Sequence, residues 1–125
     1  MNHAKSRILV SDHNFKSEVL DGSGPFVIDF SAEWCGPCRQ ASSTIDDIAG
    51  EFGEQVRFVT LDIDQSPRAA RRYHVRSVPT MLFVNEGRVV DQTSGLRPRS
   101  ELVAWIDRLL GLTGDQEGPP LKLAS

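Results

Sequence analysis

Residues 26–38 of this chain read FVIDFSAEWCGPC. The first five of them form a short run that is apolar on both faces, which is typical of a buried central strand. Cys35 and Cys38 follow at the point where a helix is expected to begin. Proline is tolerated in a first helical turn, so Pro37 fits this position. The run therefore predicts a buried strand, a short loop and a helix that opens on two cysteines.

This placement makes the two cysteines candidates for redox chemistry, since a Cys-x-x-Cys pair between a strand and a helix is typical of redox motifs in cytosolic proteins. Unpaired N–H groups and the helix dipole at a helix N-terminus favour the thiolate of Cys35, and thiolate is the attacking species. Cys38 follows one turn later on the same helix face. Attack by Cys35 on a substrate disulfide would give a mixed disulfide that Cys38 resolves.

Three other interpretations of the pair remain open. A zinc site needs two more ligands, but the chain has no second Cys-x-x-Cys and its histidines, His3, His13 and His74, are scattered. The cysteines could be inert core residues. They could also form a regulatory disulfide without turnover.

Outward from this run, short apolar segments alternate with helical patterns. Strands are predicted at about residues 8–10, 26–30, 56–63, 80–84 and 89–93, and helices at about 12–20, 35–52, 66–73 and from 98 onward. Residues 85–88, Asn-Glu-Gly-Arg, carry a hairpin signal. The order βαβαβαββα predicts an α/β fold, a central mixed sheet of about five strands flanked on both faces by about four helices.

Helix starts are marked by capping residues. Asp12 is predicted to cap the short first helix, which carries Phe15 and Val19 on one face. Ser66 followed by Pro67 is predicted to cap the third helix.

Length and composition indicate one globular domain: the chain has 125 residues, of which 39% are hydrophobic and 25% charged. We expect the domain at residues 1–111 and a disordered tail at 112–125. A net charge of −3 argues against a nucleic-acid partner, and two cysteines are too few for a secreted disulfide scaffold. No apolar run approaches the ~18 residues of a membrane span, and no signal peptide is apparent, so a cytoplasmic location without membrane association is expected.

The chain resembles the thioredoxin family over about residues 7–110. The residues that carry the resemblance are Asp29, the run AEWCGPCR at 32–39, Val78-Pro79-Thr80, Asn85-Glu86-Gly87 and Gly95. The resemblance implies the thioredoxin fold, with Cys35 as nucleophile and Cys38 as resolving thiol. It also implies a cis peptide bond before Pro79. The substrate-binding residues that it implies are Trp34, Gly36, Pro37, Val78, Pro79 and Gly95.

The family match also suggests that Asp29 is the proton acceptor and donor for Cys38. Inside an apolar central strand, a carboxylate is desolvated and tends to keep its proton, so the pKa of Asp29 is expected to be raised. The alternative is an aspartate at a strand end that faces water. For Trp34 the alternative is ordinary core packing.

The resemblance implies a thiol–disulfide oxidoreductase that reduces protein disulfides and serves cell redox homeostasis. Its electrons would come from a thioredoxin reductase, its clients would be disulfide-containing proteins, and the protein would be a monomer. No cofactor would be bound, and the redox-active group would be the Cys35–Cys38 disulfide. Two alternatives are a dedicated oxidoreductase for one partner and a thioredoxin-fold binding or chaperone-like module.

Three positions depart from the usual family pattern. Ser31 stands where tryptophan is usual, Ser43 where proline usually kinks the second helix, and Thr60 where lysine is usual. Without that lysine, the pKa of Asp29 is expected to rise further. Ser43 is expected to let the helix run straighter, and Ser31 to leave space beside the active site unless a neighbouring side chain fills it.

Positive charge is concentrated around the third helix, at Arg68, Arg71, Arg72 and Arg76. These arginines form either a solvated helix face or a docking patch for an acidic partner protein.

Overall fold

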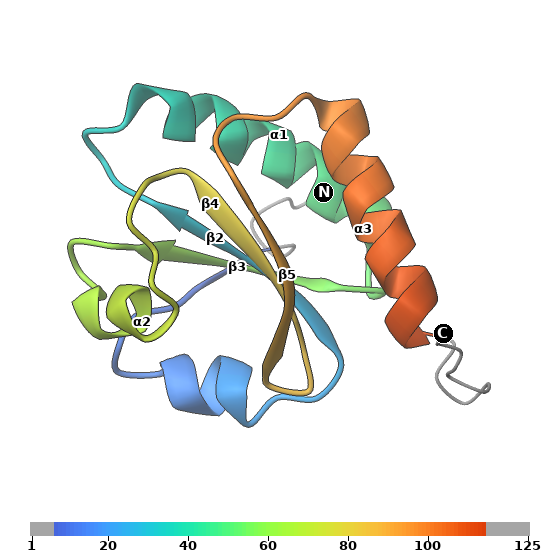
Figure 1. Cartoon of the computed structure of the whole chain (residues 1–125), viewed down its shortest axis with the longest axis horizontal. Coiled ribbons are helices and arrows are strands. Elements are labelled where there is room, and N and C mark those ends of the chain that lie inside the picture. The colour runs from blue at the N-terminus through green and yellow to red at the C-terminus, as the bar shows by residue number, and fades with distance from the viewer. Residues whose placement is uncertain (1–6, 115–125) are drawn as a thin grey trace.

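A computed structural model describes residues 7–114 and contains a five-stranded mixed sheet in the order β1-β3-β2-β4-β5 (Figure 1). The elements are, in chain order, β1 (Arg7–Leu9), the short π-helical segment η2 (Lys16–Leu20), β2 (Pro25–Ser31), α1 (Gly36–Phe52), β3 (Arg57–Asp62), α2 (Pro67–Arg72), β4 (Thr80–Asn85), β5 (Arg88–Ser94) and α3 (Arg99–Gly114). This succession confirms the predicted order βαβαβαββα and the α/β class.

The centre of the sheet is β2, the strand that leads to the two cysteines. It pairs in parallel with β3 and antiparallel with β4, while β1 pairs in parallel with β3 and β5 antiparallel with β4. All five interior residues of β2 are buried. The prediction of a central strand that is covered on both faces is therefore confirmed.

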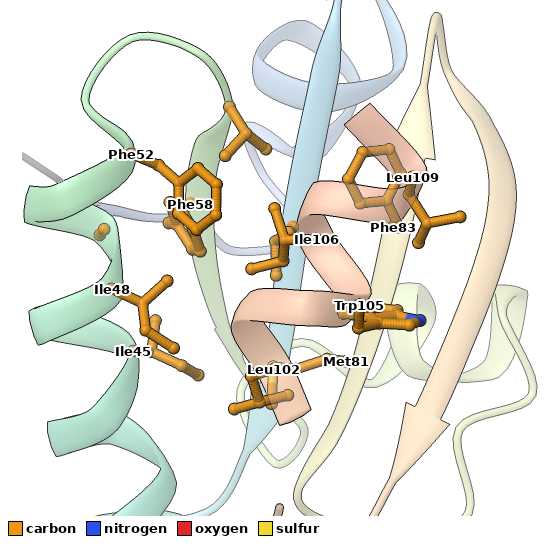
Figure 2. Close-up of a cluster of buried hydrophobic side chains, with 13 residues drawn as sticks. Ile45, Ile48, Phe52, Phe58, Met81, Phe83, Leu102, Trp105, Ile106 and Leu109 are labelled. Atoms are coloured by element: carbon orange, nitrogen blue, oxygen red, sulfur yellow. The ribbon is translucent and has the colours of Figure 1, made fainter. Parts of the chain in front are cut away.

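Alternation along β2 divides its side chains between two cores. Val27 belongs to a core that α1 and α3 cover on one face of the sheet (Figure 2). Phe26, Ile28 and Phe30 belong to a second core, which η2 and α2 complete on the other face. Residues of β2 at odd positions therefore face the layer of α1, the helix that carries the cysteines.

Trp105 of α3 is a core residue. It is 9% exposed and packs edge-on against Phe83 at 6.1 Å between ring centroids. Its Nε1 donates a hydrogen bond of 3.0 Å to Asp91 Oδ2 on β5. A buried tryptophan needs such a partner, and this bond holds α3 to the edge of the sheet.

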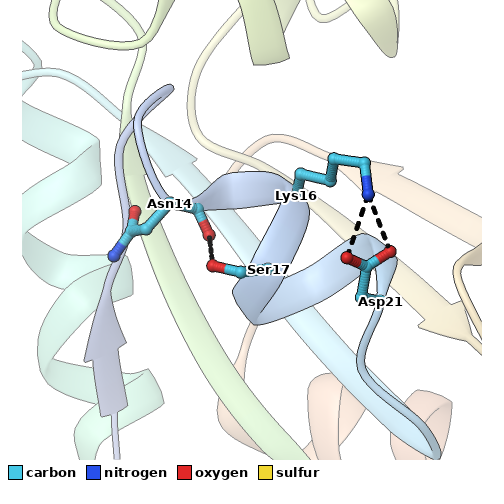
Figure 3. A network of polar contacts seen from close by, with 4 residues as sticks. All are labelled: Asn14, Lys16, Ser17 and Asp21. Atoms are coloured by element: carbon cyan, nitrogen blue, oxygen red, sulfur yellow. Dashed lines mark hydrogen bonds and ion pairs between the residues drawn. The ribbon is translucent and has the colours of Figure 1, made fainter.

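The short first helix forms as predicted, but Asp12 does not cap it. Ser17 Oγ donates to the carbonyl oxygen of Asn14 at 3.2 Å, and Lys16 Nζ pairs with the Asp21 carboxylate at 3.0 Å (Figure 3). Phe15 lies on the buried face of this segment.

Asp12 instead caps α2, 56 residues along the chain. Its two carboxylate oxygens accept hydrogen bonds from the backbone N–H groups of Arg68 at 3.1 Å and Ala69 at 3.0 Å. Ser66 occupies the N-cap position, yet its side chain makes no capping bond, and its buried Oγ has no hydrogen-bond partner within residues 7–114. The predicted cap by Ser66 is therefore wrong, because a carboxylate from another loop already takes the free N–H groups.

We expect Asp12→Ala to lower the free energy of unfolding by about 1 kcal/mol, the usual cost of losing an N-cap. The matched control is Ser66→Ala, which should be neutral or slightly stabilising because it removes a buried hydroxyl without a partner. Urea unfolding followed by circular dichroism measures both. A larger loss for Ser66→Ala than for Asp12→Ala would contradict this assignment of the cap.

The hairpin between β4 and β5 turns at Glu86 and Gly87, which have φ angles of 53° and 77°. Two successive positive φ angles are typical of the tight turns that suit twisted hairpins. A Cβ at Gly87 would lie 2.9 Å from the carbonyl oxygen of Leu20, so the position requires glycine for space as well as for conformation. The hairpin signal in the sequence is confirmed.

At its start α3 is tied to α1 by Arg99, which pairs with Asp47 at 2.8 Å and with Glu51. Hydrogen bonds to Glu51 and Asp47 raise the pKa of Arg99 above its usual range. The helix runs to Gly114, three residues past the predicted domain end, and the rest of the predicted tail, 115–125, lies outside the described residues. None of the described helices is long and apolar enough to cross a membrane.

Candidate active site: a disulfide at a helix N-terminus

Cys35 and Cys38 form a disulfide at the start of α1, with their Cα atoms 5.3 Å apart. Cys35 is the N-cap residue of that helix, and the backbone N–H of Cys38 donates to Cys35 Sγ at 3.1 Å. In the reduced protein, the same N–H and the helix dipole would stabilise a thiolate on Cys35. The predicted helix start is confirmed, and the pair is poised for thiol–disulfide exchange.

The second wall of the site is the loop before β4. Cys35 Sγ lies 3.8 Å from the carbonyl oxygen of Val78, and the Val78–Pro79 peptide bond is cis. Thr80 Oγ1 donates to the carbonyl oxygen of Ser77 at 2.7 Å, which fastens this loop. Backbone groups of the loop therefore lie beside the sulfur of Cys35.

The third segment of the site is Gly95, the residue directly after β5. The N–H of Gly95 donates to the carbonyl oxygen of Pro79 at 2.8 Å. Gly95 has a φ of 88°, a conformation that side chains disfavour, and it is exposed. The structure thus brings Cys35, Val78, Pro79 and Gly95 together from three separate parts of the chain.

Trp34 lies on the surface next to the disulfide and is 67% exposed. Its Nε1 donates to Asp64 Oδ2 at 2.9 Å, which fixes the indole ring against the loop after β3. The alternative of ordinary core packing is therefore wrong. Gly36 and Pro37 are also exposed, while Cys35 and Cys38 are only 5% and 3% exposed. The result is an exposed rim around a nearly covered disulfide.

Asp64 is a contributor that the sequence reasoning missed. It follows β3, and the carboxyl ends of the parallel strands β2 and β3 meet at one edge of the sheet. Asp64, two residues after the end of β3, therefore lies close to the loop after β2. The predicted chain order of the elements does not say which strands are neighbours, so it held no signal for Asp64 as the residue that orients Trp34.

Asp29 is 1% exposed and lies opposite Thr60 on β3 and Met81 on β4. It shares the strand face of Val27, which points to the layer of α1 where Cys38 is buried. The alternative of a strand-end aspartate that faces water is therefore wrong. Asp29 lies in the sheet beneath the helix that carries Cys38.

Three residues depart from the usual family pattern, and their positions in the structure are as follows: Ser31 follows the buried part of β2, Ser43 lies in α1, and Thr60 lies in β3. Ser31 borders an open hollow of about 520 Å³ that Cys38, Arg39 and Asp62 also line. α1 continues through the position of Ser43 as one unbroken helix. Thr60 is the direct sheet neighbour of Asp29.

We expect Ser31→Trp to fill this hollow and to shield Cys38. In the reduced protein, the rate of Cys38 alkylation by iodoacetamide should fall about threefold or more, because reactivity follows thiolate access. Ser31→Ala is the control, since it leaves the hollow open. Mass spectrometry of the alkylated peptides gives both rates, and equal Cys38 rates in the two variants would count against the hollow as a route to this thiol.

Among residues 7–114, no group of three or more histidine, cysteine, aspartate or glutamate side chains is placed to hold a metal ion. The cysteines are bonded to each other. The chemistry that this arrangement supports is therefore exchange between a dithiol and a disulfide, with two electrons transferred in each cycle.

Comparison with known proteins gives the same answer. The thioredoxin family model matches residues 6–108. Thioredoxin 1 of Synechococcus elongatus is 40% identical over 81% of this chain and 94% of its own length, and thioredoxin of Rhodospirillum rubrum is 37% identical over 78% and 94%. An M-type chloroplastic thioredoxin of Chlamydomonas reinhardtii is 38% identical over 81% and 72%. With its fold, its Cys-Gly-Pro-Cys disulfide and these relatives, the chain belongs to the thioredoxin family.

Proposed function

We propose that this chain reduces disulfides in client proteins and is itself re-reduced by a separate reductase. The chain is a thiol–disulfide oxidoreductase of the protein-disulfide reductase type, as its family and its Cys35–Cys38 pair indicate. The observation that carries the proposal is the position of Cys35, which caps α1 beside the carbonyl oxygen of Val78. This position combines an activated thiol with backbone groups that can hold a peptide.

In the first step, the Cys35 thiolate attacks one sulfur of the client disulfide. A Cys35–client disulfide forms, the client S–S bond breaks, and the departing client thiolate takes a proton from solvent. The N–H of Cys38 contacts Cys35 Sγ and would stabilise the thiolate before attack.

In the second step, Cys38 loses its proton to Asp29 and attacks Cys35 Sγ. The Cys35–Cys38 disulfide forms, and the second client thiolate leaves and is protonated. Asp29 then releases the proton of Cys38, which reaches the departing client thiolate directly or through solvent. The client has gained two electrons and two protons, and the chain has lost two electrons, the proton of Cys38 and the proton that Cys35 gave up when its thiolate formed. The burial of Asp29 on the sheet face toward α1 supports its proposed role as proton acceptor.

The client would bind as an extended peptide that pairs with the backbone of Val78, as a short added strand. Trp34, Gly36, Pro37 and Gly95 are exposed around the disulfide and would form the docking surface. Pro79 would hold the loop so that the carbonyl of Val78 faces the sulfur atoms. A flat surface with backbone recognition suits many client sequences.

The proposed electron donor is a thioredoxin reductase. The chain itself has no nucleotide-binding motif, so any nicotinamide or flavin would belong to that partner. We also propose that the protein works as a monomer in a reducing compartment such as the cytoplasm. The Gly-Pro pair between the cysteines supports the proposed role as a reductant, since it is the pairing of reducing members of the family.

Insulin disulfide reduction tests the proposal with two electron sources, first dithiothreitol and then a thioredoxin reductase with NADPH. Activity with both is expected of a general reductant. Activity with dithiothreitol alone would show that the chain is not a general reductant. It would indicate instead an oxidoreductase dedicated to another partner. Failure with both sources would overturn the proposed function.

A further inference from the structure

The segment from α2 to the active-site loop carries an unusual concentration of positive charge. Residues 66–78 contain four of the fourteen basic residues of the chain and none of its seventeen acidic residues. All four are exposed arginines. We call them the arginine surface, which consists of Arg68, Arg71, Arg72 and Arg76.

No carboxylate within residues 7–114 neutralises these charges. The basic partners of the ion pairs formed there are Lys16, Arg99 and Arg108. Asp12, which contacts this segment, and Asp64, which precedes it by two residues, are engaged with other groups. Asp12 accepts from backbone N–H groups of α2, and Asp64 accepts from Trp34. Within the described part of the chain, the arginine surface therefore presents guanidinium groups that pair with no carboxylate, and Arg72 lies over the ring of Tyr73 at 5.8 Å.

This arrangement is unfavourable for α2 itself. Arg68 and Arg72 are four residues apart, and like charges at that spacing destabilise a helix. Arg71 and Arg72 lie in the last turn, where the helix dipole favours positive charge, but Arg68 lies in the first turn, where the dipole opposes it. A solvated helix face therefore accounts for Arg71 and Arg72. It does not explain the positions of Arg68 and Arg76.

The arginine surface lies next to the redox site and is held firmly. Arg76 is two residues before Val78, whose carbonyl oxygen is 3.8 Å from Cys35 Sγ. The N–H of Val75 bonds to the carbonyl oxygen of Ala70 at 2.9 Å, and Val75 packs on the core beneath α2. Figure 1 shows α2 and the loop after it at the same end of the molecule as the loop between β2 and α1. A client bound at the disulfide would reach these arginines.

We propose that the arginine surface selects client proteins that carry aspartate or glutamate beside the disulfide to be reduced. This inference rests on the proposed function and names the class of client. Guanidinium groups bind carboxylates in a bidentate manner, and a fixed patch of one charge accelerates encounter with the opposite charge. The client is a protein and not a nucleic acid, because all seventeen acidic residues lie in the rest of the chain and would repel an extended phosphate backbone.

The test uses three synthetic peptides with one intramolecular disulfide and identical sequences except at four flanking positions, which are glutamate, glutamine or lysine. The reduced protein is mixed with each peptide at low and at physiological salt, and the second-order rate constant is measured by stopped flow. We expect the glutamate peptide to react about tenfold faster than the glutamine peptide at low salt. The lysine peptide should be slower than both, and added salt should reduce these differences.

Two triple variants separate a local effect from a change in net charge. Arg68→Gln/Arg71→Gln/Arg72→Gln should remove most of the preference for glutamate, since only Arg76 of the four remains. The control, Arg57→Gln/Arg88→Gln/Arg108→Gln, removes the same charge from exposed positions elsewhere and should keep the preference. Equal rates for the three peptides, or equal loss in both variants, would overturn the inference and leave the proposed function standing.

Two further outcomes of these experiments would also decide whether the inference holds. A short DNA duplex that inhibits reduction of the glutamine peptide through these arginines, with no preference for glutamate, would assign the surface to nucleic acid and overturn the inference. If none of the three peptides is reduced, the proposed function and this inference both fail.

Discussion

Cys38→Ser should reduce client disulfides at least about 10³-fold more slowly than the unmodified chain and should accumulate as a covalent complex with the client. The reason is that the two cysteines at the start of α1 are proposed to perform different steps. Cys35 caps α1 and can still attack, but without a thiol on residue 38 nothing resolves the mixed disulfide. Mixing the reduced variant with oxidised insulin and separating the products on a non-reducing gel shows the complex, and mass spectrometry locates the bond.

Cys35→Ser is the matched control, since it removes the other sulfur from the same turn. It should neither turn over client nor form the complex, because Cys35 is the N-cap residue whose Sγ accepts the backbone N–H of Cys38, and this activated thiol is the one removed. A complex that forms through Cys38 in this variant would reverse the proposed roles of the two cysteines. Circular dichroism of both variants would show whether α1 is intact.

Asp29→Asn should slow the second step, release of the client, by about 10²-fold while leaving the first step within a few-fold. General acid–base groups typically contribute about 10² or more, and an amide cannot accept the proton of Cys38. Rapid mixing with a fluorescent disulfide peptide separates the two steps. Asp62→Asn is the control, because it removes a carboxylate near the site without touching the buried position, and it should leave the second step unchanged.

The same variant should be more stable than the unmodified chain at neutral pH. Because Asp29 is 1% exposed, we expect desolvation to raise its pKa, so that the folded chain holds this proton more tightly than the unfolded chain does. Stability from this group is therefore present at low pH and is lost as pH rises from the unfolded pKa to the higher folded one. Asp29→Asn removes that loss, and its gain in unfolding free energy should grow between pH 4 and pH 8. A gain that is constant with pH would contradict a raised pKa.

Thr60 gives an independent check on Asp29. Thr60→Lys would place a cation on the neighbouring strand, directly opposite the carboxylate. The pKa of Asp29 should then fall, because an opposite charge favours the ionised form. NMR titration of the Asp29 carboxyl carbon measures this in both chains, with Thr60→Met as an uncharged control of similar length.

Sequence reasoning found those parts of the site that depend on local pattern. The apolar run at 26–30 identified the central strand, and the position of Cys35 before Gly-Pro identified the helix start. The hairpin at Glu86–Gly87 was readable because its turn demands positive φ angles. Each of these follows from the properties of a few adjacent residues.

Contacts between distant segments were not readable in this way. Ser66 has the right residue type for a cap, and only the fold reveals that Asp12 reaches the same N–H groups from another loop. Trp34 and Asp64 are 30 residues apart and meet because two parallel strands end side by side. Their pairing depends on strand order, which local propensity does not specify.

The cap from Asp12 has a consequence for protein engineering. Residues 66–78 form a continuous segment that could be grafted onto related chains in order to transfer client preference. They are not self-contained, because the first turn of α2 is completed by a carboxylate from the loop after β1. A graft of this segment should therefore carry Asp12 with it, and a recipient that lacks a carboxylate there would receive the arginines on a frayed helix.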